Sequence, residues 1–465
     1  MESSCAGRCV GGKMLPMRKL ERVILQKKRF RSDSIWTKKR MYGGYLSRIP
    51  VYLDTKALLK SQYWDRPTLE EMRDERIRET LISASRLPFW RARFETAGIV
   101  PQAATPADLT RLPILSKKDF LMHDRSQYVD VSRLQDALKD HTSGSTGMPF
   151  EFFIDREAEL RSFAICERMF KVNVGRRYQI IGMRSGHKPG FAFYKYHLFY
   201  LQSIMSVPHR IDDLIECAQR YSGCILYSYP SAILAVAKQM QDRPEDLRVR
   251  AAIGTGESLS SEDRTLIERN LRTKMFTNYA SRDCGYLAFE CEHKVLHLNE
   301  EWAYVEIVDA EGVPVALGQE GRIVVTLYDN RVMPLIRYAI GDHGVITAQP
   351  CVCGRTLRTI RVVGRQSDNI DLGQGRIVPL LNVSVIFNWY GGAVRQFQIV
   401  QTAPVKFTVR VIPGELFDTM REDIQDRLVR ALHPEARISW ETVEKIEPTR
   451  TGKAIYFVKA FTDRS

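Results

Sequence analysis

A short glycine-rich stretch is the most chemically informative part of the sequence. It reads His-Thr-Ser-Gly-Ser-Thr-Gly-Met-Pro over residues 141–149. Two glycines allow a turn that exposes backbone N–H groups, and the neighbouring hydroxyls add donors that suit phosphate oxygens. The stretch is not a P-loop motif, because the lysine of that motif is missing. Taken alone, it indicates either a phosphate site or an ordinary turn. The groups concerned belong to Thr142, Ser143, Gly144, Ser145, Thr146 and Gly147.

Three cysteines and a histidine have the residue types of a metal site. Cys291 and His297 share one short segment, and Cys351 and Cys353 form a second. Two ligand pairs on separate turns are what a tetrahedral Cys3His zinc site requires. Four protein ligands leave no open position, so we expect the zinc to be structural. His293 is a competing ligand, and the alternative is a set of reduced cysteines beside a surface histidine.

Five further motifs follow the glycine-rich stretch along the chain. Read singly, each is typical of a loop or turn that carries a polar residue. They are Gly254-Thr-Gly256-Glu257, Asn278-Tyr279-Ala280-Ser281-Arg-Asp283, Pro334-Leu-Ile-Arg337-Tyr338-Ala-Ile-Gly341-Asp342, Gly364-Arg365-Gln-Ser-Asp368-Asn-Ile370 and Thr449-Arg-Thr-Gly452-Lys453.

In order and spacing, the motifs resemble those of the adenylate-forming superfamily, in its phenylacetate–CoA ligase and CapK-like (coenzyme F390 synthetase-like) family. The resemblance covers roughly residues 80–460. It implies an enzyme that activates a carboxylic acid with ATP as acyl-AMP, with release of pyrophosphate. The acyl group then passes to CoA, a carrier protein, an amine or a hydroxyl. The implied cofactors are ATP and Mg²⁺, with CoA as a co-substrate; several members carry a similar zinc site.

The resemblance also implies roles for individual residues. Segment 142–147 holds the β- and γ-phosphates, and segments 254–257 and 278–281 line the nucleotide pocket. The Tyr279 ring lies against adenine, and Asp283 is a catalytic carboxylate that helps to hold Mg²⁺.

Three more side chains complete the implied machinery. Asp342 accepts hydrogen bonds from the ribose hydroxyls, a role that suits a pure acceptor. Arg365 lies near the ribose, at a hinge before a mobile C-terminal domain. Lys453 is delivered by that domain to neutralise charge on the reacting α-phosphate and carboxylate. Aromatic residues near Phe191 and Tyr227 are candidates for an acyl pocket, or for core.

Three positions depart from the usual motifs. Met148 stands where many relatives have lysine, Ala280 stands in place of glycine, and Asp283 in place of glutamate. The shorter carboxylate keeps the charge and the oxygen ligands that Mg²⁺ prefers. These departures leave open a degenerate member that binds nucleotide without turnover; acid-dependent pyrophosphate release would eliminate it. A ligase that forms an amide or ester in a polysaccharide or secondary-metabolite pathway is a second alternative.

Positive charge is concentrated at the start of the chain. The net charge is +14, and residues 1–60 contain 15 basic against 4 acidic residues. Such a segment is either a solvated helical extension or a contact for nucleic acid or an anionic membrane. Deleting it would abolish that binding and spare adenylation. No apolar run is long enough for a membrane helix, no secretory signal is evident, and we expect a cytoplasmic enzyme; a homodimer is a further expectation.

The alternation of elements predicts an α/β fold. With 465 residues and 44% hydrophobic content, the chain is long enough for two or three domains. Strands alternate with helices from residue 150 to 271, which indicates parallel βαβ units, and a β-rich subdomain follows from residue 303. We expect a basic helical extension over 1–80, an adenylation core over 81–363 and a small mobile α+β domain over 364–465. Capping residues predict a helix over 68–87.

Overall fold

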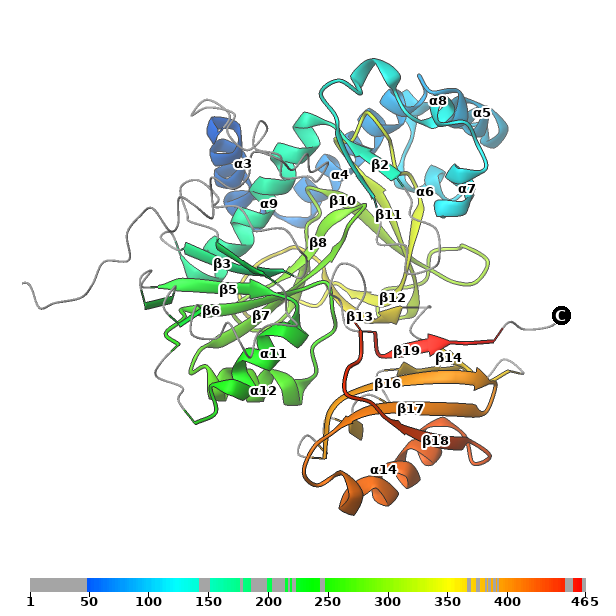
Figure 1. Cartoon of the computed structure of the whole chain (residues 1–465). Coiled ribbons are helices and arrows are strands. Elements are labelled where there is room, and N and C mark those ends of the chain that lie inside the picture. The colour runs from blue at the N-terminus through cyan, green and yellow to red at the C-terminus, as the bar shows by residue number, and fades with distance from the viewer. Residues whose placement is uncertain are drawn as a thin grey trace, which may run out of the picture.

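The structure is a computed structural model with a large sheet-centred unit and a smaller C-terminal unit (Figure 1). The figure colours the chain from its N-terminus to its C-terminus, and the smaller unit is orange to red. The residues described are 48–141, 151–175, 179–184, 199–202, 214–215, 218–219, 223–242, 247–365, 369–373, 377–380, 383, 386–387, 390, 393–447 and 455–461.

The helices of the larger unit lie around its sheet (Figure 1). They are α3 (Arg48–Ser61), α4 (Arg66–Ala84), α5 (Pro88–Ala97), α6 (Pro106–Leu109), α7 (Lys117–Leu121), α8 (Arg125–Tyr128), α9 (Arg156–Val174), α11 (Pro230–Gln239) and α12 (Ser261–Asn270), with 3-10 turns at Pro101–Ala103 and Val131–Arg133. No helix among the described residues has the length and apolarity needed to cross a membrane.

A single 11-stranded sheet forms the centre of the larger unit. Its strand order is β10-β11-β12-β13-β9-β8-β7-β6-β5-β3-β4. These strands are β3 (Gln179–Arg184), β4 (Phe199–Gln202), β5 (Cys224–Ser228), β6 (Ala251–Thr255), β7 (Lys274–Ser281), β8 (Gly285–Glu290), β9 (Leu296–Leu298), β10 (Ala303–Val308), β11 (Glu320–Leu327), β12 (Tyr338–Thr347) and β13 (Thr359–Arg365).

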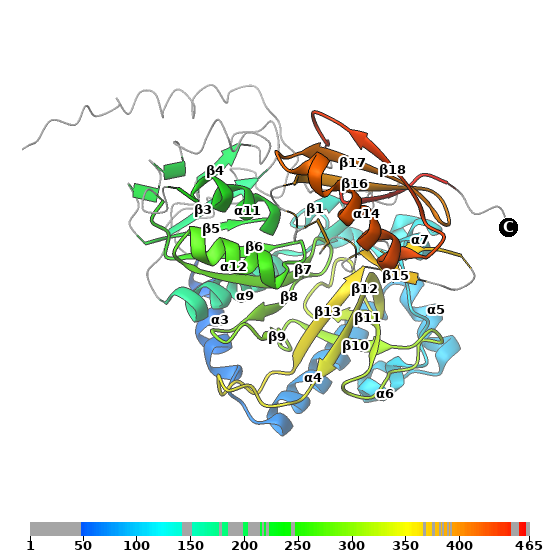
Figure 2. The ribbon, with the colours of Figure 1, turned by 90° about the horizontal axis from the view of Figure 1, so that it is seen from below.

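The sheet has a parallel half and an antiparallel half. β4, β3, β5, β6 and β7 pair in parallel, as the alternating pattern predicted. The strands from β8 onward pair antiparallel. The predicted β-rich region is therefore present, but it continues the sheet through the β9–β13 pair, Thr359 opposite His297, rather than standing apart. Figure 2 shows the two halves side by side.

A separate two-stranded hairpin lies outside the large sheet. β1 (Leu138–His141) pairs antiparallel with β2 (Glu151–Ile154), and the last Cα pair is His141 opposite Glu151. Phe152 and Phe153 are buried in the main core cluster, which fixes one end of the hairpin. The glycine-rich segment 142–150 joins the two strands and lies outside the described residues.

The C-terminal unit has its own sheet and its own core. β14 (Asn369–Asp371) pairs with β15 (Ile377–Pro379), and a four-stranded sheet has the order β18-β17-β16-β19. A hydrophobic cluster of buried residues from Ile370 to Leu432 packs between this sheet and the helix. This separate core supports the domain boundary that we propose near residue 364. The elements are β16 (Val394–Ala403), β17 (Lys406–Pro413), α14 (Phe417–Leu432), β18 (Arg437–Thr442) and β19 (Phe457–Lys459).

The N-terminal helices belong to the core of the larger unit. Leu58 of α3 and Ile77 of α4 are buried in the main cluster, and α4 runs across the boundary expected at residue 80. α4 also begins earlier than its capping pattern indicated. Asp65 is the N-cap, because its carboxylate accepts from the backbone N–H of Thr68, and Pro67 occupies the first turn.

Candidate active site and candidate metal centre

The carboxyl ends of β6 and β7 lie side by side at the candidate active site. Thr255 lies opposite Asn278 in the parallel ladder, and the Thr255 hydroxyl donates to Asn278 Oδ1 at 2.7 Å. Gly254 is required here, since a Cβ would lie 2.8 Å from Met275 Cε and 2.9 Å from Pro230 Cγ. Ligands of open α/β sheets bind at such carboxyl ends.

Glu257 stabilises the loop that follows β6. One carboxylate oxygen accepts from the backbone N–H of Ser231 at 3.1 Å, in the first turn of α11. A negative charge at this end of a helix is stabilising because of the helix dipole. Gly256 before it has φ +75°, which favours glycine. The predicted nucleotide loop 254–257 is thus tied by a hydrogen bond to the first turn of α11.

Two distant motifs meet at Tyr279 and Asp342. Tyr279 is on β7 and half-buried, whereas Asp342 is on β12 and 4% exposed. The Tyr279 hydroxyl donates to Asp342 Oδ2 at 2.7 Å. The aromatic ring and the carboxylate predicted to contact the adenine and the ribose are therefore direct neighbours. Arg365, the third predicted contact, is the Cα partner of Asp342 across the β12–β13 pair.

Asp283 lies in the turn between β7 and β8 and is 6% exposed. Its Oδ1 accepts from the Ser281 hydroxyl at 2.8 Å, and its Oδ2 accepts from the Tyr338 hydroxyl at 2.7 Å. Burial, with the Asp283 charge, raises the pKa of Tyr338, so this phenol stays a hydrogen-bond donor. Each carboxylate oxygen has a second lone pair. The group therefore keeps the capacity to bind a hard cation in a fixed orientation.

Arg282 joins the same turn to the β1–β2 hairpin. Its Nε donates to Asp140 Oδ2 at 2.7 Å, and its Nη2 donates to Asp140 Oδ1 at 2.9 Å. The Asp140 side chain is 2% exposed, whereas that of Arg282 is 43% exposed. This bidentate pair fixes the hairpin end that leads into the glycine-rich segment.

Tyr456 of the C-terminal unit has a raised pKa. Burial raises it most, and the negative charges of Glu257 and Asp263 in the larger unit raise it further. Tyr456 is three positions after Lys453 in the sequence. Lys453 and the predicted phosphate contacts Thr142, Ser143, Gly144, Ser145, Thr146 and Gly147 lie outside the described residues.

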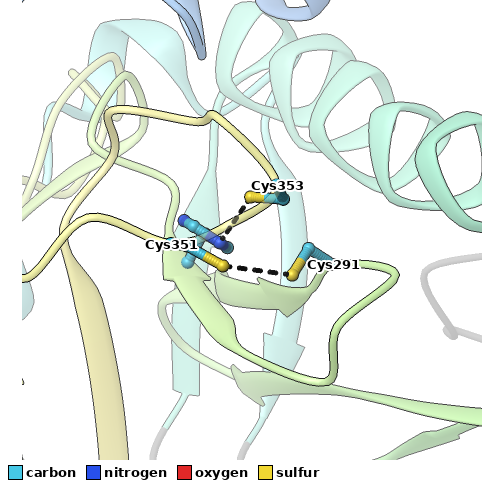
Figure 3. A group of neighbouring side chains, drawn as sticks. Cys291, Cys351 and Cys353 are labelled. Carbon is cyan, nitrogen blue, oxygen red and sulfur yellow. Dashed lines mark hydrogen bonds between the residues drawn. The ribbon is translucent and has the colours of Figure 1, made fainter.

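The four predicted zinc ligands form one cluster. Ligand atoms of Cys291, His297, Cys351 and Cys353 all lie within 4.8 Å of one another. Figure 3 shows the three cysteine sulfurs pointing inward. The Cys291 and Cys351 sulfurs are 3.9 Å apart, and the Cys353 sulfur is 3.4 Å from His297 Nε2. Tetrahedral zinc with bonds of about 2.3 Å to sulfur and 2.0–2.1 Å to nitrogen implies about 3.8 and 3.6 Å for these separations. The donor set therefore fits zinc.

The surroundings of the cluster also suit a metal. His297 Nδ1 faces the Leu357 carbonyl at 3.2 Å, a contact that aims Nε2 at the cluster. Burial lowers the pKa of His297 to about 4, so the imidazole is neutral near pH 7. Burial raises the pKa of Cys291 to about 12, so a metal would have to displace its proton. His293 contributes its backbone N–H, at 3.4 Å from the Cys291 sulfur, and is not part of the cluster.

The structure adds residues that the motifs alone did not assign. Arg337 is buried with φ +48°. Its guanidinium donates to the carbonyls of Leu112 at 2.8 Å and Gly312 at 2.7 Å, so it braces the start of β12. Asp140 and Arg282 were also missed. Their only signal in the sequence is position, directly before the glycine-rich stretch and directly before Asp283.

Comparisons with known proteins agree with this arrangement. Residues 373–460 match the CapK C-terminal domain. Phenylacetate-coenzyme A ligase of Thermus thermophilus is 25% identical over 398 residues, which cover 79% of this chain and 87% of that protein. A 2-hydroxyisobutyryl-CoA ligase in its postadenylation state has a TM-score of 0.69 at 20% identity, over 86% of this chain and 93% of that chain. In its thioesterification state, with the same coverage, that enzyme has a TM-score of 0.56 at 20% identity.

Proposed function

Because this chain belongs to the phenylacetate–CoA ligase and CapK-like branch of the adenylate-forming superfamily, we propose that it activates a carboxylic acid with ATP and transfers the acyl group to CoA. The observation that carries this proposal is the 2.7 Å hydrogen bond between Tyr279 and Asp342. It joins two motifs, far apart in sequence, that would contact the adenine and the ribose of one nucleotide.

In the first half-reaction, a carboxylate oxygen of the acid attacks the α-phosphorus of ATP. The bond from this phosphorus to the bridging oxygen breaks, and the products are acyl-AMP and pyrophosphate. The protein contributes mainly orientation and charge stabilisation. Asp342 holds the ribose, the Tyr279 ring packs on the base, and the segment after β1 accommodates the departing phosphates.

Two groups carry charge in this step. Asp283 would hold the Mg²⁺ that accompanies the nucleotide, and this cation would reduce the negative charge on the phosphates. Lys453 would approach from the C-terminal unit. Lys453 ends the last of the ordered motifs, which supports this role.

In the second half-reaction, the thiol of CoA attacks the acyl carbon and AMP leaves. The C-terminal unit would turn about the segment near residue 364 to admit CoA, a gating motion of the hinge kind. The TM-scores of 0.69 against the postadenylation state and 0.56 against the thioesterification state of the same solved enzyme support this proposed motion.

The proposed zinc would have a structural role. Four protein ligands would complete its tetrahedral shell. Cys291 follows β8, His297 lies on β9, and Cys351 and Cys353 lie in the loop before β13. Zinc would therefore join β8 and β9 to the loop before β13, where only one Cα pair links β9 to β13.

The test is carboxylate-dependent exchange between ATP and labelled pyrophosphate. A panel of aryl, fatty, hydroxy, amino and sugar acids is assayed with Mg²⁺, followed by CoA addition to the acid that responds. Exchange with one acid and thioester formation would support both half-reactions. Exchange without thioester would point to a carrier protein, amine or hydroxyl as acceptor. Nucleotide binding without exchange across the panel would favour a degenerate member.

A further inference from the structure

The bidentate ion pair between Arg282 and Asp140 connects two segments of the proposed active site. Asp140 is two positions before Thr142, near the loop end of the β1–β2 hairpin. Arg282 is the residue directly before Asp283, in the turn between β7 and β8. Both bonds of the pair have the short lengths of charge-assisted hydrogen bonds, 2.7 and 2.9 Å.

The turn that carries Arg282 is itself fixed on both sides. The Ser281 hydroxyl accepts from the Cys284 backbone N–H at 3.0 Å and donates to Asp283 at 2.8 Å. Asp283 in turn accepts from the buried Tyr338 at 2.7 Å. Arg282 therefore belongs to a turn that hydrogen bonds hold in place. Its guanidinium links this turn to the hairpin through Asp140.

The hairpin has a different anchor at its other end. The Asn330 side chain donates to the Phe153 carbonyl at 2.9 Å and accepts from the Asp155 backbone N–H at 3.2 Å. Near the loop end, Asp140 is 3% exposed, and a buried carboxylate is costly unless it is paired. Breaking the pair would therefore change the loop end of the hairpin without unfolding its anchored end.

We propose that Arg282, through Asp140, is a positioning residue that holds the end of β1 against the turn that carries Asp283 and thereby supports MgATP binding. This inference rests on the proposed function, because it assigns a role in nucleotide binding. Its main consequence is for MgATP affinity rather than for the affinity of the acid. The planar guanidinium is important because a lysine cannot form the two-bond fork.

The test is a double-mutant cycle on MgATP binding, measured by isothermal titration calorimetry with the full chain. This readout does not require knowledge of the acid. Arg282→Ala and Asp140→Ala should each raise the dissociation constant for MgATP by roughly tenfold, and the double variant should be no weaker than either single variant. Arg282→Lys should recover only part of the affinity.

An ion pair between α8 and the same hairpin gives a matched control. Arg125 and Glu151 are 3.0 Å apart, but their side chains are 54% and 37% exposed. Arg125→Ala should change MgATP affinity by less than about twofold, because exposed ion pairs contribute little. Melting temperatures of all variants, measured alongside, show whether any loss of affinity comes from unfolding.

The outcomes separate this inference from the proposed function. Folded Arg282→Ala and Asp140→Ala proteins with wild-type affinity would overturn the positioning role, even if the wild type catalyses exchange. Losses that multiply in the double variant, or a loss with Arg282→Ala alone, would also overturn it, because the arginine would then act without Asp140. A wild-type protein that does not bind MgATP would overturn both proposals.

Discussion

The hydroxyl of Tyr279, near the end of β7, donates a 2.7 Å hydrogen bond to Asp342 of β12. The two strands belong to opposite halves of the large sheet, and three further strands separate them in its order. The bond therefore connects the parallel half to the antiparallel half directly across the candidate nucleotide site. It holds an aromatic ring and a carboxylate in a fixed mutual orientation before a ligand arrives.

Replacing Tyr279 should impair the reaction with ATP only slightly, whereas replacing Asp342 should impair it strongly. Tyr279→Phe keeps the ring and loses one hydrogen bond, so the KM for ATP should rise about fivefold. Asp342→Ala removes the proposed ribose acceptor and should lower kcat/KM for ATP about 100-fold or more. Steady-state ATP–pyrophosphate exchange measures both. The wild type should discriminate against 2′-deoxy-ATP, and Asp342→Ala should not; an unchanged preference would contradict the ribose role.

Lys453→Ala should reduce the rate of adenylation while leaving MgATP binding nearly intact. The proposed lysine stabilises charge that develops as the carboxylate attacks, so kcat for exchange should fall by roughly 10²–10³-fold. Lys445→Ala is the matched control in the same unit, because Lys445 is exposed and pairs only weakly with Glu447 at the surface. Retention of more than a tenth of the exchange rate by Lys453→Ala would count against the assignment.

The cluster of Cys291, His297, Cys351 and Cys353 should contain one zinc ion per chain, as measured by elemental analysis of the purified protein. Cys351→Ser should lose the metal, and the melting temperature should fall by roughly 5–10 °C, because metal binding contributes to folding free energy. Cys224→Ala removes a cysteine from a different buried cluster and should keep the zinc. Metal content near zero in the wild type would refute the site.

Acid should remove the contribution of the buried Arg168–Glu301 pair. The side chains are 0% and 2% exposed, and the atoms Nη1 and Oε1 are 2.6 Å apart. Burial acts to raise the pKa of Glu301, but Arg168 and Ser61 outweigh it and lower that pKa below its ordinary 4.5. The stabilisation is therefore complete above pH 4.5 and disappears as the pH falls through the lower folded-state pKa.

Glu301→Gln should accordingly lower the free energy of unfolding at pH 7 by about 3–5 kcal/mol, since it leaves the Arg168 charge unpaired. Urea unfolding at a series of pH values measures this difference, which should shrink below pH 4.5. The exposed Arg410–Glu441 pair provides the control, and Glu441→Gln should cost less than about 1 kcal/mol. A difference that stays constant down to low pH would show that charge pairing is not its source.

Most of the local structure and the order of the motifs could be predicted from the residues alone. Helical and strand periodicity are properties of a few neighbouring residues, and the alternation of strands and helices predicted from residue 150 to 271 is present in β3, β5 and β6 with α9, α11 and α12. The cysteine and histidine spacing indicated a metal cluster before any distance was known, because ligand type and grouping are local features.

Which distant groups meet depends on the three-dimensional arrangement of the strands. Tyr338 donates to Asp283, Arg282 pairs with Asp140, and one Cα pair joins β9 to β13. None of these pairings has a periodic signal, because the partners lie far apart in the chain and depend on how strands are ordered. The start of α4 at Asp65 shows the same limit on a small scale. Thr68 and Asp65 are both good N-caps, and the choice between them depends on the packing of the whole helix.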